Sequence, residues 1–166
     1  VLYSNYWNQD YSYWNKNDGS EPKDALNVYV KPDYDNYNLG VCIPLDFASS
    51  KVNAYVASGY VDDKTFKMTK VNAVPAHTGV ILADLTPGEI YKINRTANAP
   101  TASSMFSASS CDNVDLSLLS GGYYWDCAAK KFGRPSDTSR PLYTGSGRSY
   151  LSFSTYQGRE FYTELW

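Results

Sequence analysis

Apolar and polar residues alternate with a period of two along most of the chain. The clearest case is segment 41–47, where apolar residues occupy the odd positions and Cys, Pro and Asp occupy the even ones. Segments 52–56, 66–69 and 150–153 alternate in the same way. Because successive side chains of a strand point to opposite faces of a sheet, this period predicts half-buried β-strands.

Shorter apolar runs predict further strands, which turn-forming residues separate. These strands are expected at 2–7, 11–15, 27–31, 80–84, 89–93, 122–126 and 161–166. No window shows the period of a long amphipathic helix, and at most a helical turn is expected near 101–108 or 112–119. Many short strands with regular turns predict an all-β sandwich, jelly-roll or immunoglobulin-like, with about nine to eleven strands.

The length of 166 residues predicts a single β-sandwich domain over 1–166. Composition changes along it, because residues 1–40 hold seven Tyr, two Trp and seven Asn but no Phe, whereas 41–93 is rich in Val, Ala and Thr. We expect the Tyr/Trp/Asn-rich stretch 1–40 to pack on the core of this domain rather than to form a second one.

The charge balance narrows the range of partners. The formal net charge is −2, whereas a nucleic-acid-binding surface normally needs a concentrated basic face. No run approaches the roughly 18 apolar residues of a membrane span. We therefore expect neither nucleic acid nor a membrane span, and the β-rich, Tyr-rich composition favours a secreted or cell-surface protein.

Three cysteines leave one unpaired in any disulfide scheme. Cys111 and Cys127 flank a Ser/Asp/Gly-rich segment that a bridge would order, so we predict that they pair. Cys42, within an apolar run, is then a buried free thiol. Three reduced cysteines in a reducing compartment are the alternative.

Catalytic signatures are weak. The one histidine, His77, has no Gly-x-Ser-x-Gly elbow elsewhere in the chain to act with, and no Cys-x-x-Cys pair points to zinc. Most acidic residues lie in turn clusters, where solvated turn formers are the simpler interpretation. We therefore predict a protein that is not an enzyme.

The segment 33–38 alternates carboxylates and amides, which are the oxygen ligands that calcium prefers. Asp33, Asp35 and Asn38 are the candidate ligands, although the spacing of an EF-hand is missing. An Asx-rich turn is the default interpretation, and no cofactor is expected beyond this structural calcium ion.

Aromatic residues are the most unusual feature of the sequence. Sugars stack their apolar C–H faces on aromatic rings, while amides and carboxylates take the hydroxyls, and here the two kinds of side chain are interleaved. The candidate ligand-binding residues are Trp7, Tyr11, Tyr13, Trp14, Tyr34, Tyr37, Tyr124 and Trp125. Trp7, Trp14 and Trp125 are the leading anchors. The alternative is that these rings fill the core of the sandwich.

Three further segments carry a resemblance to a known kind of domain. They are Val52–Tyr60 (VNAYVASGY), Phe66–Val71 (FKMTKV) and Val74–Leu82 (VPAHTGVIL), followed by later matches at 122–125 and 148–153. Over roughly 41–153 this pattern resembles a β-sandwich accessory or adhesin-like module of secreted, multi-modular Bacteroidetes surface proteins. The resemblance implies a non-catalytic module of a larger exported bacterial protein.

The sequence thus predicts a carbohydrate-binding module that binds a polysaccharide or other glycan through exposed aromatic rings. The alternative is an adhesion or structural module that contacts protein partners through the same Tyr-rich surface, since Tyr is also enriched at protein interfaces.

Overall fold

A computed structural model describes residues 25–110 and 112–166. This part of the chain is nearly all β, as predicted, with one short α-helix and one 3-10 turn. It contains 13 strands rather than the nine to eleven expected. Four of the 13 have only two residues, and pairings this short have no alternation long enough to recognise in a sequence.

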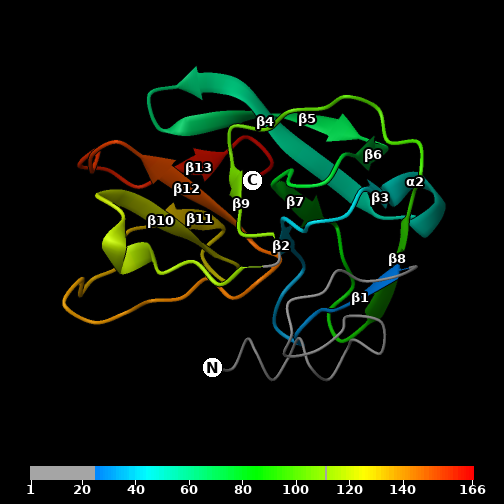
Figure 1. The fold of residues 1–166 in the computed structure, drawn as a ribbon, viewed down its shortest axis with the longest axis horizontal. Helices are drawn as coiled ribbons and strands as arrows, with labels where there is room; N and C mark the ends of the chain where they lie inside the picture. The colour runs from blue at the N-terminus through cyan, green and yellow to red at the C-terminus, as the bar shows by residue number, and fades with distance from the viewer. Residues whose placement is uncertain (1–24, 111) are drawn as a thin grey trace.

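The strands form three sheets (Figure 1). The first has the order β1 (Ala25–Tyr29), β8 (Ile90–Arg95), β3 (Leu45–Asp46) and β6 (Ala73–Val74). The second has the order β13 (Tyr162–Thr163), β5 (Thr65–Val71), β4 (Asn53–Asp62), β7 (Val80–Ala83) and β2 (Tyr37–Leu39). The third has the order β11 (Lys131–Gly133), β10 (Gly121–Asp126), β12 (Ser149–Phe153) and β9 (Ser107–Ala108). All pairs are antiparallel except β13 with β5.

Two apolar cores hold the sheets together. The first contains residues of β1, β2 and β8, and the second contains aromatic residues of β10 and β11. Strand β7 contributes to both, because Val80 and Leu82 belong to the first core and Ile81 to the second. This explains why β7 is a continuous apolar run, since both of its faces are buried.

The segment 41–47 corrects one expectation. Its alternation correctly marks the buried side chains, because every odd position from Val41 to Phe47 is buried. Only β3 is a strand, however, and it leads directly into helix α2 (Phe47–Ser50). Asp46 caps that helix by accepting a hydrogen bond from the Ser49 N–H over 3.1 Å, so the backbone leaves the sheet at this point.

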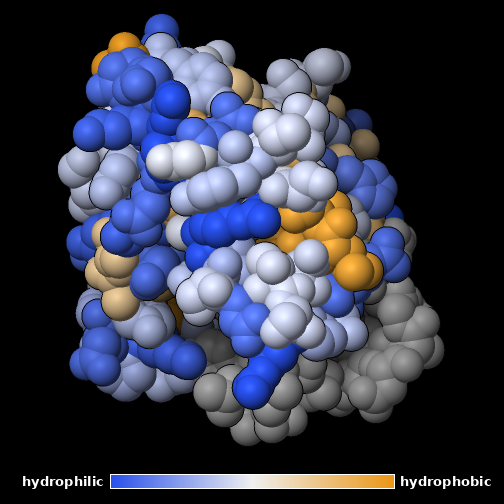
Figure 2. Space-filling model, turned by 90° about the vertical axis from the view of Figure 1, so that its left-hand side faces the viewer, coloured by the Kyte–Doolittle hydropathy of each residue, from blue (hydrophilic) through white to orange (hydrophobic). Residues whose placement is uncertain are grey.

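Strand β10 and the short turn η1 (Leu116–Leu118) lie at the left-hand end of the molecule in Figure 1. Figure 2 views that end, where polar side chains predominate around a compact hydrophobic patch. The turn η1 falls within 112–119, one of the two segments in which at most a helical turn is expected from the sequence.

None of the helices in the described residues has the length and apolar character needed to cross a membrane.

Candidate functional site

Two adjoining cavities lie beside β10. We name the larger one, of about 530 Å³, the loop cavity, because the segment 135–144 forms most of its wall. The smaller one, of about 380 Å³, is the tyrosine cavity, lined by Tyr29, Tyr34, Tyr37 and Tyr124. Both are lined by Asn38, Tyr124, Trp125 and Arg148. The two cavities therefore adjoin across a common set of side chains.

The alternation of β10 decides which aromatic ring faces solvent. Tyr123 and Trp125 point into the second core, and Tyr124 between them is 36% exposed. Gly133 lies opposite Tyr124 on β11, and a Cβ built on this glycine would lie 3.5 Å from the Tyr124 ring. Such a contact is of ordinary van der Waals length, so the Tyr124 ring lies directly over Gly133 on the neighbouring strand.

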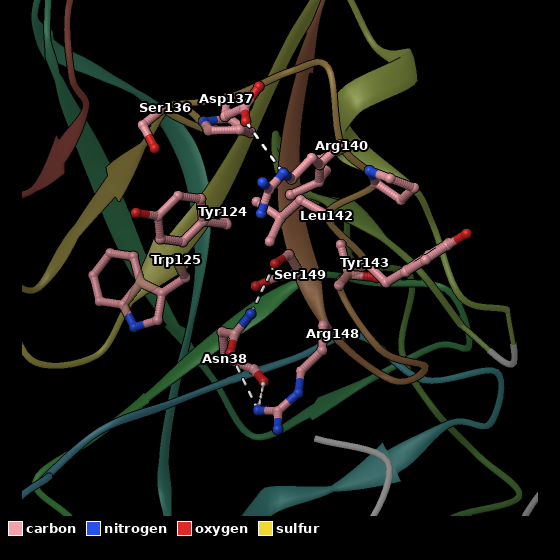
Figure 3. Close-up of a pocket in the computed structure, with 14 residues that line it drawn as sticks. Asn38, Tyr124, Trp125, Ser136, Asp137, Arg140, Leu142, Tyr143, Arg148 and Ser149 are labelled. Atoms are coloured by element: carbon pink, nitrogen blue, oxygen red, sulfur yellow. Dashed lines mark hydrogen bonds and ion pairs between the residues drawn. The ribbon is translucent and has the colours of Figure 1, made fainter. Parts of the chain in front are cut away.

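The wall of the loop cavity brings a second exposed ring and several polar side chains. Tyr143 is 49% exposed, and Figure 3 shows Tyr124 and Tyr143 on opposite sides of the cavity with Arg140 and Leu142 between them. Ser136 and Asp137 line the cavity next to Tyr124. The cavity therefore combines aromatic rings with side chains that donate and accept hydrogen bonds.

Hydrogen bonds to η1 and the residues before it hold this wall in place. The carboxylate of Asp115 accepts from the Leu142 N–H over 3.1 Å and from the Ser117 N–H over 3.0 Å. In return, the Leu116 N–H donates to the Leu142 carbonyl over 2.8 Å. The side-chain hydrogen bond from Ser117 is the largest cause that lowers the pKa of Asp115. The ionised carboxylate of Asp115 thus holds the wall in place.

Asp137 and Arg140 form the ionic part of the wall. Asp137 accepts hydrogen bonds from the Ser139 hydroxyl and from the Ser139 N–H at 2.9 Å, and these lower its pKa. Its other oxygen lies 3.7 Å from Nε of Arg140, a side chain that is 84% exposed. This contact is too long to be a strong hydrogen bond.

The floor shared by the two cavities is built from Arg148 and Asn38. The Arg148 guanidinium lies 4.3 Å from the centre of the Tyr37 ring, and its Nη1 lies 3.3 Å from Oδ1 of Asn38. The Asn38 amide donates to the Ser149 carbonyl over 2.8 Å. Asn38 and Arg148 are both buried, so the floor is polar, and the Asn38 side chain is held at both its nitrogen and its oxygen.

This arrangement bears on the calcium hypothesis. Oδ1 of Asn38 faces a cationic guanidinium, and the Asp35 carboxylate is paired with Lys130 at 3.2 Å. Asp33 is exposed. Across residues 25–110 and 112–166, no three His, Cys, Asp or Glu side chains are grouped as metal ligands would be. Calcium at Asp33, Asp35 and Asn38 stays a prediction that this geometry does not favour.

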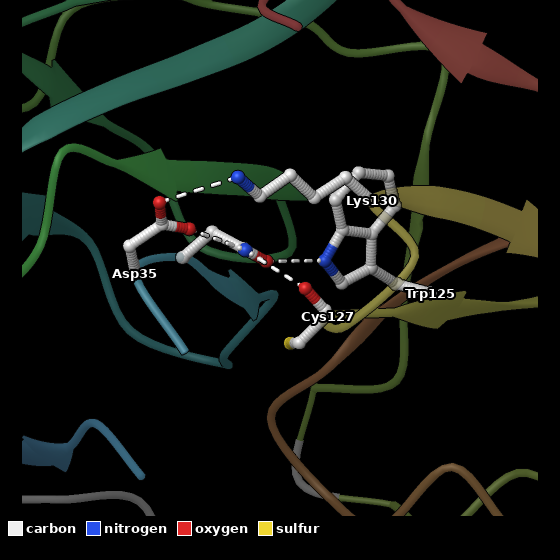
Figure 4. Close-up of polar contacts among 5 residues, drawn as sticks. Asp35, Trp125, Cys127 and Lys130 are labelled. Carbon is white, nitrogen blue, oxygen red and sulfur yellow. Dashed lines mark hydrogen bonds and ion pairs between the residues drawn. The ribbon is translucent and has the colours of Figure 1, made fainter. Parts of the chain in front are cut away.

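Trp125 differs from the exposed anchor that the sequence suggested. It is only 5% exposed, and its ring packs against Phe132 at 5.0 Å and Trp166 at 6.0 Å between centroids. Its indole N–H donates to Asn36 rather than meeting the neighbouring Asp126 (Figure 4). Trp125 is a core residue with an edge on both cavities, so the expectation of an exposed stacking platform at this position is wrong.

The other predicted binding residues have different outcomes. Tyr34 is half-buried and Tyr37 is buried, and both line the tyrosine cavity with Tyr124. The remaining four, Trp7, Tyr11, Tyr13 and Trp14, lie outside the described residues. The predictions therefore identified part of one cavity, and Tyr124 is the member with an accessible ring.

The loop cavity is the stronger candidate for a ligand site. Several residues of the tyrosine cavity already have interaction partners of their own: Tyr29, Lys31, Tyr34, Tyr37 and Arg148. Of these, only Arg148 also lines the loop cavity.

The structure also places residues that the sequence analysis did not single out for binding. Tyr143, Asp137 and Arg140 lie between β11 and β12, in a segment rich in Pro, Ser, Asp and Arg. One feature of the sequence could have marked this segment as a functional loop. Pro135 and Pro141 bracket a polar stretch that is too irregular for a strand.

The cysteine prediction is wrong. Cys42 is disulfide-bonded, and Cys127 carries a free thiol. Burial raises the pKa of Cys127 to about 11. Cys111 lies outside the described residues. A short sequence separation was a poor guide to pairing, because strands distant in sequence are neighbours in this fold.

His77 has a polar partner but lies outside both cavities. Its Nδ1 lies 2.6 Å from the Ser110 hydroxyl, and its backbone N–H donates to the Val41 carbonyl. Among the described residues no carboxylate forms a hydrogen bond or ion pair with the imidazole. These contacts join His77 to two other loop segments.

Comparison of the chain with protein-family profiles, with curated proteins and with solved structures finds no match.

Proposed function

We propose that this chain is a non-catalytic carbohydrate-binding module of an exported or cell-surface protein, and that it binds glycan in the loop cavity. Tyr124 and Tyr143 stack on sugar rings, while Ser136, Asp137 and Arg140 form hydrogen bonds with sugar hydroxyls. No bond of the ligand is broken in this proposal, so binding itself is the function.

One observation carries the proposal. Two tyrosine rings, 36% and 49% exposed, line one cavity of about 530 Å³ together with a serine, a carboxylate and a guanidinium. An aromatic face meets the C–H side of a pyranose, and the hydroxyls around the sugar need both donors and acceptors. A cavity of this volume lies within the range of small-molecule sites and has room for a short oligosaccharide segment.

The disulfide at Cys42 supports the exported location. Disulfides persist in oxidising environments and are rare in reducing cytosol. The proposed place of the chain on a cell surface or in the medium, as part of a larger multi-modular protein, agrees with this chemistry.

The test is a binding screen with a matched pair of variants. The purified chain is run through affinity gels that contain plant or host polysaccharides and is applied to a glycan array. We expect retardation on at least one polysaccharide, weakened by Tyr143→Ala. Tyr156→Ala is the control, because Tyr156 is equally exposed at 49% but does not line the loop cavity.

Two results would contradict the proposal. One is the absence of binding to every polysaccharide and array glycan by a correctly folded chain. The other is binding that Tyr156→Ala weakens as much as Tyr143→Ala does. Specific capture of a protein partner without any glycan binding would favour the adhesion module instead.

A further inference from the structure

The loop cavity has a charge that differs in sign from that of the whole chain. The lining side chains that are charged at neutral pH are Arg140, Arg148 and Asp137. Their formal charges sum to +1, whereas the net charge of the chain is −2. Both arginines belong to the same cavity although they come from different segments. Arg148 is buried, whereas the Arg140 side chain is 84% exposed, so Arg140 is the cation that a ligand entering the loop cavity meets.

Arg140 is the arginine with donors available to a ligand. Within residues 25–110 and 112–166, its one polar contact is the 3.7 Å approach of Nε to Asp137. Its guanidinium turns toward Tyr124 in Figure 3. Arg134, by contrast, donates from Nη1 to the Ser120 carbonyl over 2.9 Å and lies over the Tyr156 ring.

Asp137 positions Arg140 without saturating it. Its Oδ1 is taken by two hydrogen bonds from Ser139, so only Oδ2 faces Arg140. The separation of 3.7 Å leaves the two terminal nitrogens of Arg140 free of this contact. A guanidinium with both terminal nitrogens accessible matches the two oxygens of a carboxylate in a bidentate pair.

We propose that the loop cavity selects sugars that carry a carboxylate, such as uronic acids, through Arg140. This inference rests on the proposed function, and it adds the class of glycan. The sugar ring stacks on Tyr124, and the carboxylate at the edge of that ring pairs with the Arg140 guanidinium.

The experiment compares acidic oligosaccharides with their own uncharged derivatives. Tetrasaccharides of polygalacturonate, alginate and hyaluronan are titrated into the chain by calorimetry, each beside its carboxyl methyl ester. We expect at least one acid to bind about 10-fold or more tightly than its ester at low salt, since one charge-assisted pair contributes on that order. The preference should shrink as salt increases, because the pair is exposed.

Two arginine variants assign the preference to a side chain. Arg140→Gln should abolish the difference between acid and ester, because the amide keeps a hydrogen-bond donor but removes the positive charge. Arg159→Gln is the control, because Arg159 pairs with Asp63 and does not line the cavity. It should leave the preference unchanged.

Several outcomes would overturn the inference. Equal affinity for acid and ester in every pair would show that the cavity does not select for charge. A preference for the acid that survives Arg140→Gln would show that Arg140 is not the residue responsible. If a sulfated glycan, such as chondroitin sulfate, binds more tightly than any carboxylate, the cavity selects sulfate groups rather than planar carboxylates. If neutral glycans bind in a Tyr143-dependent manner without charge preference, this inference fails and the proposed function stands.

Discussion

The indole N–H of Trp125 donates a hydrogen bond to Oδ1 of Asn36 over 2.9 Å, and this contact joins two parts of the chain that are 89 residues apart. The Asn36 amide in turn donates to the Cys127 carbonyl and to Asp35, each over 3.0 Å (Figure 4). Asn36 is 1% exposed. One buried amide thus connects the segment before β2 to the strand that carries Tyr124.

Replacing Asn36 with alanine should destabilise the fold. The change leaves the buried Trp125 N–H and the Cys127 carbonyl without their partner, which costs about 1–3 kcal/mol of the free energy of unfolding. Urea unfolding followed by tryptophan fluorescence measures this loss in the free energy of unfolding. Asn98→Ala, at an exposed position, is the control and should unfold at the wild-type midpoint. An unchanged midpoint for Asn36→Ala would show that water replaces the amide without cost.

The Cys127 thiol should react slowly in the folded protein. With its pKa raised by burial from the ordinary value of 9.0 to about 11, only about 0.1% of it is thiolate at pH 8, against about a tenth of an ordinary cysteine. Iodoacetamide labelling followed by mass spectrometry should modify Cys127 only after unfolding. Rapid labelling of Cys127 in the native chain at pH 8 would contradict the buried thiol.

The same thiol should make stability fall at alkaline pH. Its pKa is higher in the folded chain than the ordinary value of 9.0, so the folded state holds the proton more tightly. The stabilisation is therefore complete below about pH 8.5 and disappears as the pH rises toward 11, by about 2–3 kcal/mol. Cys127→Ala should flatten this part of the pH profile, and an unchanged slope would assign it to tyrosines instead.

Two glycines should respond in opposite ways to alanine. A Cβ on Gly121 would lie 2.5 Å from the Thr155 carbonyl oxygen and 2.7 Å from that of Phe153, both backbone atoms. Gly121→Ala should therefore cost about 1–3 kcal/mol or more, as overpacking does. A Cβ on Gly59 meets nothing within 4 Å, so Gly59→Ala should be neutral or slightly stabilising. Equal thermal midpoints for the two variants would contradict the close strand packing at Gly121.

Asp115 should control the order of the cavity wall. Asp115→Ala removes the acceptor of the Leu142 and Ser117 N–H groups, so these amides should exchange with deuterium faster in the variant. Glycan affinity should fall with them, because the wall carries Tyr143. Asp112→Ala, at an exposed position before η1, is the control. Unchanged exchange at Leu142 would mean that backbone pairing alone holds the wall.

Alternation proved a better guide to burial than to hydrogen bonding. Alternation located β5 and β12, and apolar runs located β7 and β10, to within a residue or two, because in these strands burial and backbone pairing coincide. In segment 41–47 they do not coincide. Its odd positions are buried, but Pro44 lacks an N–H and Asp46 favours a helix cap, so most of the segment is outside the sheets.

Only part of the candidate site could be predicted from the sequence. Tyr124 and Trp125 were found because they are aromatic, but alternation along β10 buries Trp125, the expected anchor, and exposes Tyr124. Arg140 and Tyr143 come from an irregular segment, whose place in space depends on hydrogen bonds to Asp115. No local pattern encodes that long-range contact.

One measurement tests glycan binding in the loop cavity most directly. It compares the affinities of Tyr124→Ala and Tyr162→Ala, by calorimetry, for a glycan identified in the binding screen. The two tyrosines are 36% and 37% exposed, but only Tyr124 lines the cavity. Tyr124→Ala should weaken binding by about 5- to 150-fold, corresponding to a stacking contribution of about 1–3 kcal/mol, with an unchanged unfolding midpoint. Tyr162→Ala should bind like the wild type. Wild-type affinity in Tyr124→Ala would contradict a stacking role for this ring and place the glycan elsewhere on the molecule.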